Sequence, residues 1–268
     1  MPRPAQARVM PDDTKPGAPA PPEFYSRTYF ETRCGGCAEY HASGGRELDP
    51  IRAFALDLVA PRRGEWVLDL GSGRAELCAA MTQAGARVVG VDFSRDALAM
   101  ARETAQRLGT PYALVCARAE ALPLRDASLD ATLATDIVEH LPDADLRAAV
   151  REVCRSLKPG GRFVVHTAPT RAFLTIGQHV KRLLQWLARE TVAPLLTYES
   201  ELVEAGHSNI HSRASLNAAL MDDFPSPKVF YAFSDPRRPG RRFAAMVGLA
   251  ALLGFNLWAL ARRPEEGS

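Results

Sequence analysis

The 268-residue chain has 33 basic and 31 acidic residues, so its formal net charge at pH 7 is only +2, and 47% of its residues are hydrophobic. This composition is typical of a globular protein, and it lacks the excess positive charge with which nucleic-acid-binding proteins contact phosphates. The length allows one sizeable α/β core with additions. We therefore expect no nucleic-acid partner.

The first part of the chain divides into a tail and a cover. Residues 1–22 are rich in proline and alanine and contain no apolar stretch of the kind a signal peptide has, so we expect a disordered tail. Residues 23–64 are predicted to form a lid segment and a helix, Leu48–Val59, that covers one end of the core. The five cysteines are odd in number and scattered, which suits reduced thiols in the cytoplasm.

Residues 65–170 are predicted to form an α/β core, because strand-like and helix-like segments alternate from Trp66 to Pro169. This alternation indicates a doubly wound, mostly parallel sheet with helices on its faces. The predicted strands are Trp66–Leu70, Arg87–Val91, Tyr112–Cys116, Ala131–Thr135 and Arg162–His166. The predicted helices carry apolar residues at helical spacing, and they contain Leu77 to Ala84, Ala97 to Leu108 and Leu146 to Leu157.

Capping and breaking residues lie where these helices should begin and end. Ser94 can cap the second helix, Gly109 can end it and Pro111 prevents its continuation. The Lys-Pro-Gly-Gly turn at Lys158–Gly161 ends the third helix. Residues 171–268 are expected to add helices on the acceptor side and, at Phe255–Leu260, an antiparallel last strand.

The segment from Val67 to Glu76 places a buried strand, a turn of small residues and a helix start in direct succession. In an open α/β sheet this first turn lies in the ligand crevice. Gly71 and Gly73 have no Cβ, so the backbone can turn sharply and approach a ligand closely. Asp69 can accept a hydrogen bond from a cationic amino group, such as that of a methionine-like ligand.

A second acid follows at the end of the next strand, about twenty residues beyond the glycines. Asp92 is expected to accept hydrogen bonds from both hydroxyls of a ribose. NAD is disfavoured, because its fingerprint has a glycine at the sixth position, where this chain has Glu76, and a carboxylate there would repel the pyrophosphate. A sulfonium nucleoside has no phosphate to repel.

The combination of motifs resembles the methyltransferase type 11 group of class I S-adenosylmethionine-dependent methyltransferases. The matching segments, in chain order, are Val67–Ala75, Gly90–Asp92, Ala119–Leu124, Ser128–Asp130, Asp136–Leu141 and Leu157–Phe163. The resemblance implies a Rossmann-like fold, a methyltransferase activity and S-adenosyl-L-methionine as cofactor. It implies that the cofactor is bound by Asp69, Gly71, Ser72, Gly73, Asp92, Phe93, Ala119, Glu120, Thr135 and Asp136.

Three residues depart from the family's pattern. Ala75 replaces the third glycine of the first motif and Ser72 replaces its common cysteine, and both are small enough to keep the turn. Arg118 stands where the family has an acidic acceptor for the adenine amino group, and a guanidinium has no acceptor to offer. The backbone of Ala119 and the side chain of Glu120 would then bind adenine. A protein that binds the cofactor without transferring methyl is the alternative from a different class.

Methyl transfer to a hydroxyl needs a general base near the acceptor. Asp136 and His140 follow the fourth strand and His166 closes the fifth, so all three are expected to reach the crevice. His140 is a candidate base, and the competing interpretation is that it caps or bridges the turn before Pro142. Asp136 is expected to contact the cofactor or the acceptor rather than to act as a base.

The segment Phe24–Glu31 resembles the N-terminal lid of bacterial glycan-associated methyltransferases. Tyr29 and Phe30 are expected either to close over the cofactor or to fasten the lid to the core. Cys34 and Cys37 form a Cys-x-x-Cys pair, but no second ligand pair accompanies them, so we predict no metal site.

The segment from His207 to Ser215 resembles the same glycan-associated proteins. His207 and Asn209 are expected to line the acceptor pocket, with His207 as a second candidate base, or else to make hydrogen bonds within a loop. Ser212 or Ser215 is expected to cap a helix that ends near Met221. This resemblance implies O-methylation of a sugar or glycan precursor or of another small molecule, with a hydrophobic, quinone-like or lipid-linked acceptor as the alternative.

Two segments raise the question of a membrane. Phe243–Ala261 is uncharged and about as long as a minimal membrane span, but a sheet still needs Phe255–Leu260 as its last strand, and Phe243–Leu253 is then expected to be a short apolar helix. Val180–Leu187 is basic and amphipathic and is expected to be a surface helix, able to lie on a membrane. We expect a cytoplasmic protein, peripheral at the inner face of the membrane if this helix binds lipid.

Overall fold

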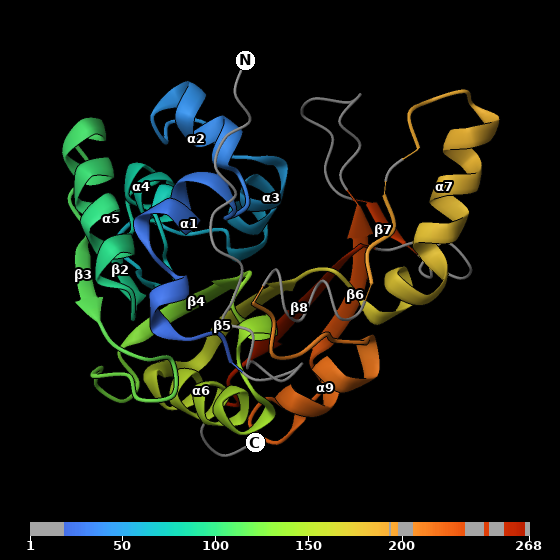
Figure 1. Ribbon diagram of the computed structural model, residues 1–268. Helices are drawn as coiled ribbons and strands as arrows, with labels where there is room; N and C mark the ends of the chain where they lie inside the picture. The colour runs from blue at the N-terminus through green and yellow to red at the C-terminus, as the bar shows by residue number, and fades with distance from the viewer. Residues whose placement is uncertain (1–18, 193, 198–205, 234–243, 247–254, 266–268) are drawn as a thin grey trace.

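The computed structural model describes residues 19–192, 194–197, 206–233, 244–246 and 255–265. Within these ranges eight strands form one mixed sheet, in the order β3-β2-β1-β4-β5-β8-β6-β7 (Figure 1). The strands are β1 (Trp66–Leu70), β2 (Arg87–Asp92), β3 (Ala113–Cys116), β4 (Leu129–Thr135), β5 (Leu157–Thr167), β6 (Lys228–Phe233), β7 (Ala244–Met246) and β8 (Asn256–Arg262). The predicted doubly wound α/β fold is confirmed.

The first five strands pair in parallel, and the last three are antiparallel to their neighbours. β8 lies between β5 and β6, with Trp258 opposite His166 on one side and Phe230 on the other. The predicted antiparallel strand near the C-terminus is therefore confirmed. Sequence analysis missed β6, because residues beyond Pro169 show no clear alternation of elements.

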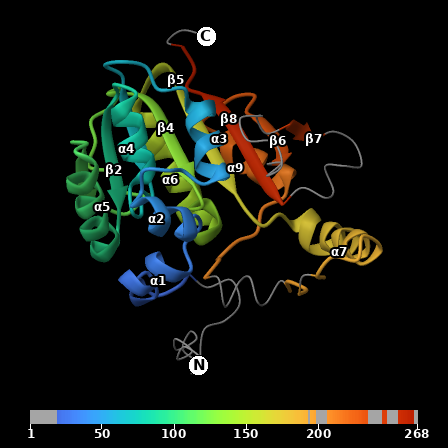
Figure 2. The same ribbon diagram turned by 90° about the horizontal axis from the view of Figure 1, so that it is seen from above.

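Helices cover both faces of this sheet (Figures 1 and 2). They are η1 (Pro22–Phe24), α1 (Arg27–Thr32), α2 (Cys37–Ser43), α3 (Pro50–Val59), α4 (Glu76–Gln83), α5 (Arg95–Leu108), η2 (Val138–His140), α6 (Asp143–Ser156), η3 (Phe173–Gly177), α7 (Gln178–Leu187) and α9 (Arg213–Met221). The predicted caps are present: Ser94 accepts from the amide of Ala97, and Gly109 ends α5 in the left-handed conformation. Ser212 and Ser215 form a capping box at the start of α9.

Two apolar clusters fill the space between sheet and helices. One joins Val67, Leu133 and Trp258 of the strands to residues of α3 and α4. The other joins Leu68 and Leu70 to residues of α6 and α9. Alternate residues of β1 thus face opposite layers, which is why the strands of a sheet covered on both faces read as continuous apolar runs. This core holds the carboxyl ends of β1, β2 and β4 in a fixed relation.

The structure partly corrects the prediction for the apolar segment near the C-terminus. Residues 244–246 form β7 rather than a helix, and the remaining residues of the predicted helix, 243 and 247–253, lie outside the described ranges, as do residues 1–18 of the predicted tail. A membrane span over Phe243–Ala261 is excluded, because Asn256–Arg262 is a strand with partners on both sides. Among the described residues, no helix has both the length and the apolar character to cross a bilayer.

Candidate functional site

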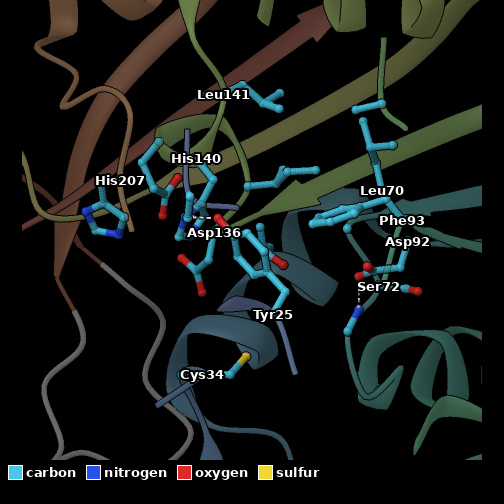
Figure 3. A pocket seen from close by; sticks show the side chains of 18 of the residues that line it. Tyr25, Cys34, Leu70, Ser72, Asp92, Phe93, Asp136, His140, Leu141 and His207 are labelled. Carbon is cyan, nitrogen blue, oxygen red and sulfur yellow. Dashed lines mark hydrogen bonds between the residues drawn. The ribbon is translucent and has the colours of Figure 1, made fainter. Parts of the chain in front are cut away.

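A pocket of about 1170 Å³ opens over the carboxyl ends of the parallel strands. Its wall comes from the turns after β1, β2 and β4, from the lid residues before α1, and from the segments that follow β5. All ten residues that the resemblance assigns to the cofactor line it, and so do His140 and His207 (Figure 3). His166 and Asn209 do not line it. His166 therefore does not reach the crevice as expected, and Asn209 follows the alternative interpretation, because its side-chain amide donates a hydrogen bond to Asp143.

The turn after β1 is shaped by two glycines with left-handed backbone, Gly71 (φ 73°) and Gly73 (φ 51°). A Cβ on Gly71 would lie 2.9 Å from Cδ1 of Ile137, closer than real side chains pack. The amide of Gly71 donates to the carbonyl of Val91 at 2.8 Å, and the amide of Gly73 donates to Oδ2 of Asp92 at 2.9 Å. Asp92 therefore fixes the turn as well as facing the pocket.

Two carboxyl groups at the strand ends are buried next to this turn. Asp69 is 1% exposed and Asp92 is 7% exposed. Burial raises the pKa of Asp69 to about 7, although the Cys78 thiol donates to its Oδ2 at 3.2 Å. Burial also raises the pKa of Asp92 to about 6, opposed by the backbone amides of Ser94 and Gly73. A cationic or hydroxyl-bearing ligand would lower the pKa of both groups, because such a ligand stabilises the charged carboxylate.

The side of the pocket next to β2 carries Phe93, Ala119 and Glu120. Phe93 is 37% exposed and can present its ring to a base, while Ala119 is buried. Arg118 forms an ion pair with Glu120, and its side chain remains 61% exposed. The guanidinium that departs from the family's pattern is therefore neutralised at the rim of the pocket.

Asp136 follows β4 in the left-handed conformation (φ 54°), which is uncommon for a residue with a side chain. Its Oδ1 lies 2.6 Å from Nδ1 of His166, and Nε2 of His166 lies 3.1 Å from Oδ1 of Asn256. Burial would raise the pKa of Asp136, but the charge and hydrogen bond of His166, together with Arg52, outweigh it and lower the pKa to about 2. His166 thus lies behind Asp136 and holds its carboxylate toward the pocket.

His140 joins two distant segments of the chain and also lines the pocket. Its Nδ1 lies 3.0 Å from the hydroxyl of Tyr25 (Figure 3) and 3.1 Å from the carbonyl of Gly206, so it does bridge two segments. The tautomer with its hydrogen on Nδ1 satisfies this carbonyl, which only accepts, and leaves Nε2 as a proton acceptor. Burial lowers the pKa of His140. The ring is therefore neutral at pH 7.

Glu139 lies within the matching segment Asp136–Leu141, and sequence analysis gave it no role. It is 2% exposed, lines the pocket, and its Oε2 has no hydrogen-bond partner among the described residues. Burial and the neighbouring Asp136 raise its pKa well above the usual value. The only sequence signal for this group was its place next to His140 in the motif.

Glu139, His140 and His207 each have a ligand-type atom within 4.8 Å of the others, and they form the one such group in the described ranges. Burial lowers the pKa of His207 to about 3, so its imidazole is neutral, as a metal ligand requires. One carboxylate and two imidazoles can hold a divalent cation. The predicted Cys-x-x-Cys pair is separate from this group: Cys34 lines the pocket, and the Cys37 thiol donates to the backbone of the lid.

The lid is fastened to the cofactor turn by Arg74, which sequence analysis missed. This side chain is 1% exposed, and its guanidinium donates to the carbonyls of Phe30 and Gly35 at 2.6 Å each. It also pairs with Glu76 at 2.8 Å. Both predicted roles of the lid aromatics are compatible with this geometry, since Tyr29 and Phe30 line the pocket and Phe30 also packs against α5.

Comparison with known proteins gives a consistent match for the core. Residues 68–165 match a family model described as a methyltransferase domain. The chain is 38% identical over 121 residues to a ubiquinone biosynthesis O-methyltransferase of Paracidovorax citrulli, covering 43% of this chain and 48% of that protein. It is 34% identical over 149 residues to a protein of the same name from Ralstonia nicotianae, covering 54% and 61% respectively. The chain thus spans about half to three fifths of these relatives.

Solved structures extend the likeness of the fold to most of the chain. A possible histamine N-methyltransferase of Thermotoga maritima superposes with a TM-score of 0.57 at 18% identity, covering 88% of this chain and 99% of that one. The magnesium protoporphyrin IX methyltransferase of Synechocystis superposes with a TM-score of 0.54 at 17% identity, covering 88% and 94%. At such identities the likeness concerns the fold alone.

Proposed function

Because residues 68–165 match a methyltransferase domain model, we propose that this protein is an S-adenosylmethionine-dependent enzyme that methylates a hydroxyl group on a quinone-related aromatic ring. The family match supports the predicted enzyme class, and the residues that line the pocket support the predicted cofactor. The acceptor is inferred from the relatives. The observation that carries this inference is the 34–38% identity to ubiquinone biosynthesis O-methyltransferases.

The donor would bind along the turns after β1 and β2. Asp69 is suited to accept from the amino group of the methionine moiety, and Asp92 is suited to accept from the ribose hydroxyls. Each carboxylate oxygen of Asp92 already receives one backbone amide, and each keeps a second lone pair for a hydroxyl. Phe93, Ala119 and Glu120 would surround the adenine, and Glu120 neutralises the charge of the neighbouring Arg118.

The rest of the pocket would hold the acceptor. Its volume of about 1170 Å³ exceeds the roughly 300–1000 Å³ typical of a site for one ligand, so donor and acceptor can fit together. The lining beyond the cofactor turns includes the apolar side chains of Leu141, Pro169, Leu196 and Phe255. An aromatic ring with an apolar tail matches such a wall better than a sugar, whose hydroxyls would each need a polar partner.

His140 is the side chain best suited to remove the hydroxyl proton. Its neutral ring has an accepting Nε2, and the bond from Nδ1 to Gly206 fixes its orientation. Deprotonation makes the oxygen a stronger nucleophile for displacement at the sulfonium methyl group. Methyl leaves the sulfur with its bonding pair left behind, so the products are a methyl ether, the neutral thioether and a proton on the base.

The glycan acceptor implied by the flanking segments is not supported by these relatives, and we do not retain it. It does define the alternative outcome of the test. The purified protein would be incubated with methyl-labelled S-adenosylmethionine and either a polyprenylated catechol or a sugar nucleotide. Label on a catechol oxygen, located by mass spectrometry, is expected. Label in the sugar alone would overturn the proposed acceptor, and tight cofactor binding without any transfer would favour the non-catalytic binding module.

The role of His140 has its own test. His140→Gln keeps a side chain able to donate to Gly206 but removes the base, so kcat for the catechol should fall by about 100-fold or more while cofactor affinity stays unchanged. A more acidic, nitro-substituted catechol should lose much less activity in this variant. Equal losses with both catechols would rule His140 out as the base.

A further inference from the structure

The helix α7 carries an apolar face that the described protein leaves in contact with solvent. Ile176, near the end of the preceding η3, and Leu183, Leu184 and Leu187 of α7 lie on one side, and their exposed fractions are 47%, 54%, 55% and 62%. Trp186, at the flank of this face, is 66% exposed. A helix of a globular protein normally turns such a stripe toward the core. Here α7 extends away from the sheet in both views (Figures 1 and 2).

The base of α7 is firmly attached to the body of the protein. Phe173 and Leu174 of η3 are buried with Ile210, and the ring of Phe173 lies 4.9 Å from that of Phe255, a residue of the pocket wall. The exposed apolar face is therefore an ordered feature that is joined to the wall of the pocket.

Gln178 connects the same helix to a second residue of that wall. This side chain is 6% exposed, donates from Nε2 to the carbonyl of Leu196 at 2.7 Å and accepts the amide of Leu196 at 2.8 Å. Leu196 lines the pocket. Whatever covers α7 thus lies next to the acceptor side of the site.

The charges around the apolar face are predominantly positive. Between residues 171 and 192 the cations are Arg171, Lys181, Arg182 and Arg189, and the single acid is Glu190. This combination suits a surface that is apolar inside and anionic outside. Two copies of the chain packed face to face would instead bring two sets of cations together.

We propose that the apolar face of α7, defined by Ile176, Leu183, Leu184 and Leu187, docks on an anionic lipid bilayer. The leucines would enter the boundary between headgroups and acyl chains, Trp186 would lie at the level of the headgroups, and Lys181 and Arg182 would extend to the lipid phosphates. Docking would bring the pocket next to the bilayer, where an acceptor with an apolar tail resides. This last step rests on the proposed function, whereas the docking does not.

Vesicle binding of the full chain tests the proposal without any methyl transfer. The protein should sediment with vesicles that contain phosphatidylglycerol and should bind vesicles of phosphatidylcholine alone at least roughly tenfold more weakly. Leu183→Ser/Leu187→Ser and Lys181→Glu/Arg182→Glu should each weaken binding to the anionic vesicles by roughly tenfold or more. The matched control is Met221→Ser on α9, a side chain that is 52% exposed and should leave binding unchanged.

Tryptophan fluorescence identifies the residue that enters the lipid. Binding should shift the emission of Trp186 to shorter wavelength, and Trp186→Phe should remove the shift while retaining most of the sedimentation with vesicles. Absent vesicle binding, equal binding to neutral and anionic vesicles, or a lipid-free dimer that Leu183→Ser/Leu187→Ser dissociates in light scattering would each overturn the proposal. If the protein bound vesicles but did not methylate the catechol, only the proposed acceptor would be refuted, and the docking would stand.

Discussion

At the scale of single residues, the pocket depends on backbone conformations that few side chains tolerate and on acids that the fold has buried. Gly71 and Gly73 supply the left-handed turn, and Asp92 links that turn to the end of β2 through the amide of Gly73. The role expected for Asp92 in binding is thus joined to a structural one. Replacing Asp92 would remove the proposed ligand contact and would also release the turn.

Gly73→Val should abolish cofactor binding and leave a folded protein. A branched side chain opposes the positive φ of 51° and enters the space beside Phe30, next to the pocket. Gly64→Val is the matched control, because Gly64 has a φ of 82° and open space around its missing Cβ, so it carries the backbone strain without the site. Calorimetry should find cofactor binding in the control alone, and normal affinity in Gly73→Val would contradict this placement of the crevice.

The buried acids predict opposite pH dependences for stability and for binding. The folded-state pKa values of Asp69, about 7, and of Asp92, about 6, lie above the unfolded value near 3.8. The stabilisation that these protonated carboxyls give the folded state is therefore fully present below about pH 4 and is lost as the pH rises to about 7. For Asp92 this loss is about 3 kcal/mol of unfolding free energy. Cofactor affinity should instead rise over this range, because the ligand is bound by the carboxylates.

Titration calorimetry in two buffers of different ionisation enthalpy measures this linkage. Binding at pH 6 should release protons, and the release should vanish above about pH 8. Asp69→Asn should reduce the release, since an amide does not titrate. Proton uptake on binding at pH 6, or a pH-independent affinity, would refute the assignment of these carboxyls to the cofactor.

At the scale of elements, two attachments decide whether the pocket is complete. The antiparallel strand β8 places Asn256 against His166, behind Asp136, and Arg74 joins the lid to the turn after β1. Both attachments position residues that line the pocket.

Trp258→Asp should destabilise the protein by more than about 4 kcal/mol, because it places an unpaired charge in the core. Trp258 is fully buried, with its ring 4.8 Å from that of Phe54 and 4.4 Å from that of His166. Trp66→Asp is the matched control, since Trp66 is 39% exposed at the start of β1. Urea denaturation should show a small loss for the control, and a similarly small loss for Trp258→Asp would contradict the position of β8.

Arg74→Met should cost about 3–5 kcal/mol, because it leaves the carboxylate of Glu76 buried without its partner. Arg74→Met/Glu76→Leu should recover part of that loss while the lid stays detached. Urea denaturation measures the stability, and protection of the lid against proteases measures its attachment. If the double variant were as unstable as the single one, the ion pair would not be the cause.

At the scale of the whole molecule, the pocket is where three distant parts of the chain meet: the lid, the strand ends and the segments around Leu196, His207 and Phe255. Ligand binding should therefore change the amide hydrogen exchange of all three parts. The fold itself is continuous beneath them, with apolar clusters on both faces of one sheet.

The demethylated product of the cofactor should slow amide hydrogen exchange in Arg27–Thr32 and in residues 136–141, because both segments border the pocket. Exchange in α9 should stay unchanged, since Arg213–Met221 does not line the pocket. Mass spectrometry of peptides from each segment provides the measurement. Protection of α9 without protection of Arg27–Thr32 would contradict the assignment of the lid.

The sequence alone determined the α/β core and the cofactor turn, because both depend on local patterns. Apolar runs at regular spacing, caps such as Ser94 and breakers such as Gly109 fix each element from its own residues. The glycines and Asp92 lie within one strand-turn-helix-strand unit, so they too could be recognised without the fold. β6 was missed because its residues follow a segment without clear alternation.

Only the tertiary structure decided which distant groups face one another. Arg74 reaches the lid, His166 withdraws behind Asp136, and Tyr25 meets His140 across 115 positions of sequence. No local pattern encodes these contacts, because they arise when the sheet brings strand ends together and the chain folds back over them. The exposure of Leu183 and Leu187 is also decided by the tertiary structure. The amphipathic pattern of α7 is local, but packing sets the direction in which its apolar face points.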